Sequence, residues 1–121
     1  MEIEQLVQRH LEGKTVYPAF LEEPAKAQRP PRYYLAARLG NTPDNHINHA
    51  RIAVQSYAPS LVEAMALNRA AYEAMKSLPE LSAVTSAGLV SDYNFTDTAT
   101  GRYRWQAVYE ISYYDDVLSK E

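Results

Sequence analysis

The nearest approach to a metal-binding motif in this 121-residue chain is residues 44–49, which place one carboxylate and two imidazoles close together. Asp44, His46 and His49 are side chains of the kinds that ligate zinc and other borderline metals. The two histidines lack the spacing of a rigid helical motif, and turn-forming residues surround them. The pattern favours a solvated turn, and a small metal-dependent or acid/base enzyme using these three residues is the alternative.

Two pairs of carboxylates could support general acid–base chemistry, Asp92 with Asp97 and Asp115 with Asp116. The first pair falls in an expected loop, where turn geometry alone favours aspartate, and the second falls in an expected frayed tail. The chain has no cysteine, its serines lack elbow-type glycines, and its 4 glycines form no phosphate-binding loop. The sequence therefore predicts no catalytic residue, no metal site and no cofactor.

Aromatic side chains are the unusual feature of the composition, with 10 tyrosines against 2 phenylalanines and 1 tryptophan. Rings with a polar tip suit half-wet positions such as subunit interfaces. One interpretation is a stacking platform for single-stranded nucleic acid, built from Trp105 and the tyrosines. Its charge would come from five arginines: Arg32, Arg38, Arg51, Arg102 and Arg104. The other interpretation is a core and subunit interface, with these arginines paired to carboxylates of a neighbouring subunit.

The overall charge favours the interface. The chain has 12 basic and 15 acidic residues, a net charge of -3, so it lacks the broad cationic field that phosphates require. We therefore expect no specific nucleic-acid binding. With 46% hydrophobic and 22% charged residues, the composition predicts one globular domain over residues 1–121. No stretch has the length of a membrane span and the first residues lack a secretory signal, so we expect a cytoplasmic origin and no membrane partner.

The elements that position these side chains are organised around a strand that turns directly into a long helix. In residues 50–56 the apolar Ala50, Ile52 and Val54 alternate with Arg51 and Gln55, as in a half-buried strand. Ser60 stands three residues before Glu63, the capping-box spacing, so a helix should begin at Leu61. Asn68 falls on the polar side of this helix. Its apolar face is predicted to consist of Leu67, Ala70, Ala71, Ala74, Met75 and Leu78.

Before this unit, a short N-terminal helix is expected to end at Gly13. A short strand could follow at residues 15–17, and residues 22–31, with three prolines, should form an exposed loop. Residues 32–39 have the alternation of a strand, and the turn residues at 40–45 predict a hairpin with the strand at Ala50. The buried face of the first helix is predicted to consist of Ile3, Leu6, Val7, His10 and Leu11.

After the central helix we expect a weaker strand at residues 83–90, a polar loop at 92–101 and a long strand at 102–114, part of which could project beyond the sheet. One face of the last strand should carry Tyr103, Trp105, Ala107, Tyr109, Ile111 and Tyr113. The order of elements predicts an α+β domain. Its mostly antiparallel sheet of four to five strands should have two helices packed on one face.

Several stretches taken in order carry a family resemblance. They are residues 54–60 (VQSYAPS) leading into 63–64, then 92–97 with its Asn-Phe pair, then 102–105 (RYRW) and 111–114 (ISYY). Together with the N-terminal helix and the chain length, they resemble the small tail-terminator or tail-completion proteins of long-tailed bacteriophages. The resemblance extends over nearly the whole chain.

The resemblance implies an α+β subunit of a ring, typically hexameric, at the head-proximal end of the tail tube in the virion. Such rings stop tube polymerisation and dock the head connector, and they have no catalytic residues. The implied partners are further copies of the chain, the tail tube protein and a head-completion or connector protein, with contacts through residues 22–31, 40–49 and 92–101. The candidate interface residues are Tyr33, Arg38, Arg51, Asp92, Asp97, Arg102, Arg104, Trp105 and Tyr114.

Overall fold

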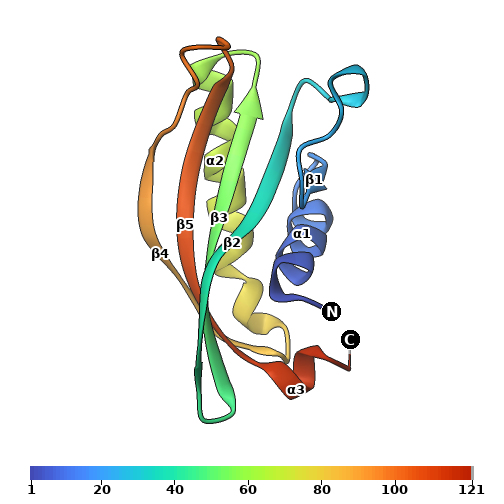
Figure 1. The fold of residues 1–121 in the computed structure, drawn as a ribbon, viewed down its shortest axis with the longest axis vertical. Coiled ribbons are helices and arrows are strands. Elements are labelled where there is room, and N and C mark those ends of the chain that lie inside the picture. The colour runs from blue at the N-terminus through green and yellow to red at the C-terminus, as the bar shows by residue number, and fades with distance from the viewer. Residues whose placement is uncertain (121) are drawn as a thin grey trace.

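The structure is a computed structural model that describes residues 1–120. Figure 1 shows a single twisted sheet with its long helices packed against it. In chain order the elements are α1 (Ile3–Lys14), β1 (Ala19–Phe20), the 3₁₀ turn η1 (Lys26–Gln28), β2 (Tyr33–Asp44), β3 (Ile47–Ala58), α2 (Leu61–Lys76), the 3₁₀ turn η2 (Leu78–Glu80), β4 (Val84–Asn94), β5 (Tyr103–Tyr114) and α3 (Asp115–Leu118).

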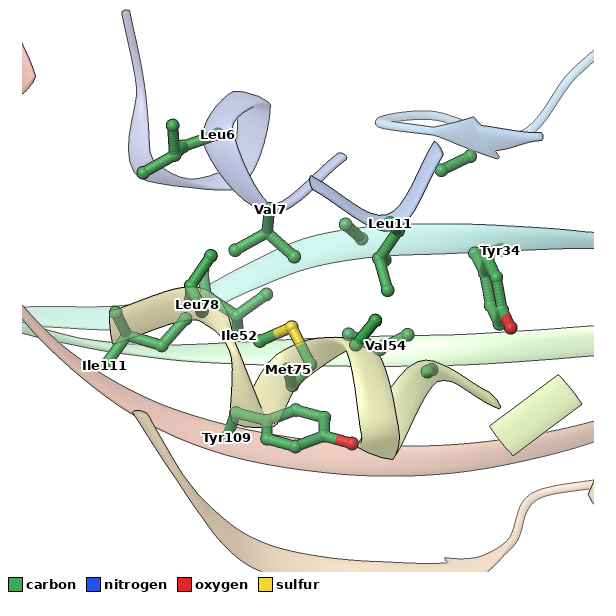
Figure 2. Packing of buried hydrophobic residues seen from close by; sticks show 14 of the residues in the cluster. Leu6, Val7, Leu11, Tyr34, Ile52, Val54, Met75, Leu78, Tyr109 and Ile111 are labelled. Carbon is green, nitrogen blue, oxygen red and sulfur yellow. The ribbon is translucent and has the colours of Figure 1, made fainter. Parts of the chain in front are cut away.

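The sheet has five strands in the order β1-β2-β3-β5-β4. Among the described strands, only the pairing of β1 with β2 is parallel, and the other pairs of neighbours are antiparallel. Both α1 and α2 pack against the same face, where they share one buried apolar cluster with the strands (Figure 2). The predicted α+β architecture, a mostly antiparallel sheet with two helices on one face, is confirmed.

The core is built from the alternation that the sequence predicts. Ile52 and Val54 of β3 and Tyr109 of β5 point toward the helices and are at most 2% exposed. Figure 2 shows Val7 and Met75, from the two helices, meeting over these strand residues. Because the contacts are apolar and close-packed, burial of this layer supplies most of the folding free energy.

Helix α2 begins at Leu61, as predicted, because Ser60 caps it. The Ser60 Oγ accepts a hydrogen bond from the Glu63 N–H at 3.3 Å. The reciprocal half of the capping box is missing, since the Glu63 carboxylate accepts hydrogen bonds from Arg32 and from the Ser60 hydroxyl. Asn68, placed on the polar side by the sequence, is 8% exposed and faces β4, where its amide finds a hydrogen-bond acceptor.

Helix α1 buries the five residues predicted for its inner face. The Nε2 of His10 lies 2.8 Å from the carbonyl oxygen of Ala74 and so joins α1 to the end of α2. Two expectations here are wrong. The helix passes through Gly13 and is capped at Thr15, and the short strand that follows is β1 at Ala19–Phe20 and not residues 15–17.

The β2–β3 hairpin is longer than the sequence indicates. Residues 40–44 were expected to be turn but continue β2, and the turn itself is Asn45 and His46. Asn45 has a φ of 55°, a left-handed conformation that asparagine tolerates better than most residues. Residues 39–46 are exposed, and Figure 1 shows this end of the hairpin extending beyond the helices.

Strand β5 lies inside the sheet along its whole length, so the expectation that part of it projects is wrong. All 12 of its residues pair with β3, and β4 pairs with it from Tyr113 to Trp105. The edge position belongs to β4, which continues to Asn94, beyond its predicted end at residue 90. Its register shifts between Val84 and Ser86 and again between Leu89 and Ser91, so the strand carries two bulges.

The chain after β5 is ordered and not frayed, contrary to expectation. Asp115 and Asp116 form the first turn of α3, and Leu118 at its end is 1% exposed in the core. Aspartates in a first helical turn are stabilised by the backbone N–H groups there. Among residues 1–120, no helix has the length and apolar character needed to cross a membrane.

Candidate functional site

The face of the sheet opposite α1 and α2 has no layer of described helices above it (Figure 1). The register of the strands assigns the side chains that point to this uncovered face. They are Tyr33, Leu35, Ala37, Arg51, Ala53, Gln55, Tyr57, Tyr93, Arg104, Gln106, Val108 and Glu110. The set mixes apolar, aromatic and charged residues in proportions that are typical of a protein–protein interface.

An aromatic–arginine ladder crosses one end of this face, and we define it as Phe20, Tyr33, Tyr57, Phe95, Arg102 and Arg104. The rings of Tyr33 and Tyr57 stack with centroids 4.7 Å apart and planes 8° apart. The guanidinium of Arg102 lies 4.5 Å from the Tyr57 ring centre, and that of Arg104 lies 4.3 Å from the Phe95 ring centre. Stacked rings with cations over them make a stiff surface.

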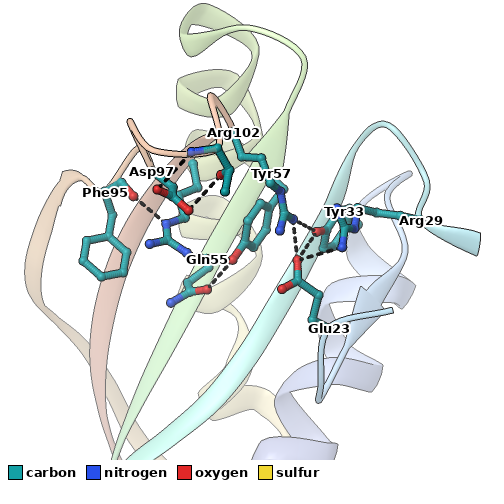
Figure 3. Close-up of polar contacts among 10 residues, drawn as sticks. Glu23, Arg29, Tyr33, Gln55, Tyr57, Phe95, Asp97 and Arg102 are labelled. Atoms are coloured by element: carbon teal, nitrogen blue, oxygen red, sulfur yellow. Dashed lines mark hydrogen bonds and ion pairs between the residues drawn. The ribbon is translucent and has the colours of Figure 1, made fainter. Parts of the chain in front are cut away.

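Glu23, from the loop before β2, ties that loop to the ladder (Figure 3). Its carboxylate forms an ion pair with Arg102, accepts a hydrogen bond from the Tyr33 hydroxyl at 3.0 Å and lies 3.7 Å from Arg29. These contacts, the hydrogen bond from Arg102 first, lower the pKa of Glu23 below its ordinary value. No sequence pattern singled out Glu23, because its partners are distant in the chain.

Beside the ladder, amide and hydroxyl groups satisfy one another across three strands. The Gln55 Nε2 donates to the Gln106 Oε1 at 2.8 Å, the Tyr57 hydroxyl donates to the Gln55 Oε1 at 3.0 Å, and the Gln106 Nε2 donates to the Tyr93 hydroxyl. Such a network fixes side chains that would otherwise be free to rotate. Val108, in the next row of this face, is only 6% exposed although no described helix lies over it.

A hollow of about 360 Å³ adjoins the ladder. Prolines and tyrosines form its apolar part, and Lys26, Arg29 and Arg102 bring three cations to it. Among the described residues, only Glu23 neutralises the two arginines, and Lys26 has no ion-pair partner. This end of an acidic protein is therefore locally cationic.

The candidate residues at the β4 end split between two environments. Asp92 accepts hydrogen bonds from the Asn68 amide at 2.9 Å and from the Trp105 indole, between α2 and β4. Asp97 belongs to the loop after β4, where the Thr100 hydroxyl donates to it and lowers its pKa. Asp92 and Asp97 thus serve different contacts, and the structure does not join them in one acid–base pair.

The remaining candidates lie away from the ladder. Arg38 pairs with Glu2 at 3.0 Å, and Arg51 pairs with Glu110 at 3.6 Å on the uncovered face. Tyr114 is 37% exposed at the opposite end of β5. Of the five arginines singled out in the sequence, four therefore form ion pairs within the chain, and Arg104 instead donates to the Tyr57 hydroxyl at 3.2 Å.

The structure brings together only part of the candidate site formed by Asp44, His46 and His49. The Nε2 of His49 lies 3.8 Å from the Asp44 carboxylate, while its Nδ1 lies 2.8 Å from the Ser112 Oγ. His46 occupies the exposed tip of the hairpin. In the part of the chain that the structure describes, no three His, Asp or Glu side chains come together as a group that could hold a metal ion.

No protein-family model matches the chain, and no curated protein is significantly similar to it. The resemblance to phage tail terminators therefore stays a prediction drawn from the sequence.

Proposed function

We propose that this chain is a structural assembly protein of the tail-terminator kind, whose copies form a ring that caps the tail tube of a long-tailed bacteriophage and docks the head connector. The uncovered face of the sheet is the observation that supports this most. It carries stacked aromatics, paired arginines and a closed amide network in a layer with no helix above it. A surface built in this way offers contacts to another protein.

The stiffness of the uncovered face suits assembly. Tyr57 is held by a ring stack on one side, by Arg102 over its face and by hydrogen bonds at its hydroxyl. Because these side chains are already ordered, little rotamer entropy remains to be lost when a partner binds.

The β2–β3 hairpin supports the same proposal. Its tip, residues 39–46, is exposed, and this end of the hairpin reaches past α1 and α2 (Figure 1). Because every residue of this tip is exposed, packing against a neighbouring subunit or the tail tube would bury surface and so stabilise it.

The runner-up function is a binding module that stacks nucleic-acid bases on the aromatic rings. The 38% exposure of Phe95 and the 39% exposure of Tyr93 favour it. The burial of Tyr33 and Tyr57 argues against base stacking. At 2% and 4% exposure, neither ring offers a free face to a base. A salt-titrated binding assay with single-stranded DNA separates the two, since phosphate-driven binding weakens steeply as salt rises.

The oligomeric state tests the main proposal. Static light scattering of the purified chain over a concentration series should show masses rising above the 13.7 kDa monomer, and electron microscopy of the same sample should show closed rings. A strict monomer at the highest concentration reached would contradict the proposal.

A further inference from the structure

A small polar notch lies between α2 and β4, on the flank of the sheet opposite β1. It has a volume of about 250 Å³ and is lined by Met65, Asn68, Arg69, Tyr72, Asp92 and Trp105. Asp92 and Trp105 were candidate interface residues in the sequence, but no ligand was assigned to the notch that they line. Its residues come from three elements that the fold brings together, α2, β4 and β5, so no single stretch of the sequence predicts it.

The hydrogen-bond acceptors of the notch are incompletely used. The Asp92 Oδ1 accepts from the Asn68 amide and the Trp105 indole, but Asp92 forms no ion pair with any described residue. The Asn68 Oδ1 is buried without a hydrogen-bond partner among the described residues. A group bringing N–H donors and positive charge would complement this set.

The aromatic walls of the notch fit the same kind of ligand. Tyr72 is 39% exposed, and the chain's own Lys76 ammonium already lies 5.2 Å from the centre of its ring. Trp105 forms the other wall and is held by Asp92. An ammonium between aromatic faces and beside a carboxylate gains cation–π and Coulomb energy together. The notch therefore suits a lysine side chain.

The other flank of the same molecule presents such a side chain. Lys26 stands in η1, in the exposed loop before β2, and forms no ion pair with any residue in the described part of the chain. The sheet register places both features at one end: Asp92 pairs with Ala107, Ala107 with Val54 and Val54 with Ala36, close to where the loop joins β2. Figure 1 shows this loop and β4 on opposite sides of the sheet.

We propose that the notch between α2 and β4 binds the Lys26 side chain of a second copy of this chain. The inference rests on the proposed function, because it names the contact between neighbours in the ring. Each copy then offers its cationic loop to one neighbour and its notch to the other. Such a contact joins two different surfaces, so repetition around an axis closes a ring or extends a helix and does not stop at a twofold dimer.

Cross-linking in the cysteine-free chain tests the contact. Ala27→Cys labels the loop and Met65→Cys labels the notch, and both positions are exposed while Lys26 and Asp92 stay intact. The two variants are mixed and treated with a short bismaleimide. We expect cross-linked dimers in the mixture and almost none with either variant alone. Circular dichroism of each variant checks that it is folded.

The charge dependence of the cross-link separates Lys26 from other cations. Adding Lys26→Gln to the loop-labelled chain, or Asp92→Asn to the notch-labelled chain, should lower the mixed product about tenfold. Combining Lys26→Asp with Asp92→Lys should restore it. Lys14→Gln, at an exposed lysine on α1, is the matched control and should change nothing. If Lys26→Gln leaves the mixed product unchanged, the assignment of Lys26 is overturned.

The remaining outcomes distinguish this contact from the proposed function. Oligomers in light scattering without the mixed cross-link, or with loop-to-loop dimers only, overturn the notch contact and leave ring formation standing. A strict monomer in light scattering overturns both.

Discussion

On the covered face of the sheet, Ile52, Leu67 and Tyr109 are sealed between strands and helices, and their burial comes from apolar packing of two layers. On the uncovered face, Tyr33 and Tyr57 are nearly as well buried with no helix above them, because side chains of the same layer close over one another. The difference teaches that the uncovered face keeps its shape without a partner. It can therefore serve as a preformed docking surface.

Removing a core side chain should produce the largest effect. Leu67→Ala deletes a side chain that is 1% exposed, so we expect a loss of about 2–5 kcal/mol in the free energy of unfolding, measured by urea denaturation. Val62→Ala, at a 76% exposed position on the same helix, is the control and should cost less than about 0.5 kcal/mol. An equally small loss for both would mean that the covered face is not the main source of stability.

On the uncovered face, Tyr57→Phe should have a smaller effect. It keeps the ring stack but removes the hydroxyl that donates to Gln55 and accepts from Arg104, at a cost of about 1 kcal/mol. Tyr103→Phe is the matched control, because its hydroxyl bonds to no described residue. Urea denaturation measures both variants. If Tyr57→Phe were as harmless as Tyr103→Phe, the hydrogen bonds of the uncovered face would contribute nothing to its order.

Glu23→Gln should cost less than about 1 kcal/mol at pH 7, because the carboxylate is partly exposed to solvent. The folded state lowers the pKa of Glu23 from 4.5, so its contribution is complete above that value and is lost as the pH falls through the lowered pKa. Wild type and variant should therefore differ at pH 7 and converge in acid. Amide hydrogen exchange in residues 22–31, compared between wild type and variant at each pH, measures this difference in local stability. Glu22→Gln, at an exposed carboxylate, is the control, and a difference that grew in acid would contradict the assignment.

The smallest effect is expected where the uncovered face is most open. Arg51 and Glu110 form an ion pair with side chains 57% and 47% exposed, so Arg51→Gln should change the unfolding free energy by less than about 0.5 kcal/mol. Denaturation in low and high salt measures it. A loss above about 1 kcal/mol would show that this row of the sheet is ordered as strongly as the ladder.

Local patterns sufficed to predict much of the covered face. Ile52 and Val54 alternate with Arg51 and Gln55, and Ser60 marks the start of α2. Both signals could be read because they depend on neighbours in the sequence. The continuation of β2 through residues 40–44 could not be read in this way. Residues 40–44 are all exposed, so they carry the turn composition of a solvated segment and no alternation.

The candidate site was predicted in its residue types but not in its arrangement. Tyr33, Arg102 and Arg104 were singled out, yet Glu23, which holds two arginines and a tyrosine together, lies in a loop with no periodicity. Asn68 was predicted to lie on the polar side of α2, and this prediction is wrong. Only the approach of β4 gives its amide an acceptor and makes burial tolerable.

The two bulges in β4 have a consequence for how copies of this chain can multiply. An outer strand with an unbroken row of N–H and C=O groups would accept another strand, and then another, which is the route to a fibre. Here the row changes register near Thr85 and again near Val90, so an added strand finds only short matching runs. Growth by sheet extension is thereby discouraged at this edge, and a finite assembly is protected from becoming an endless one.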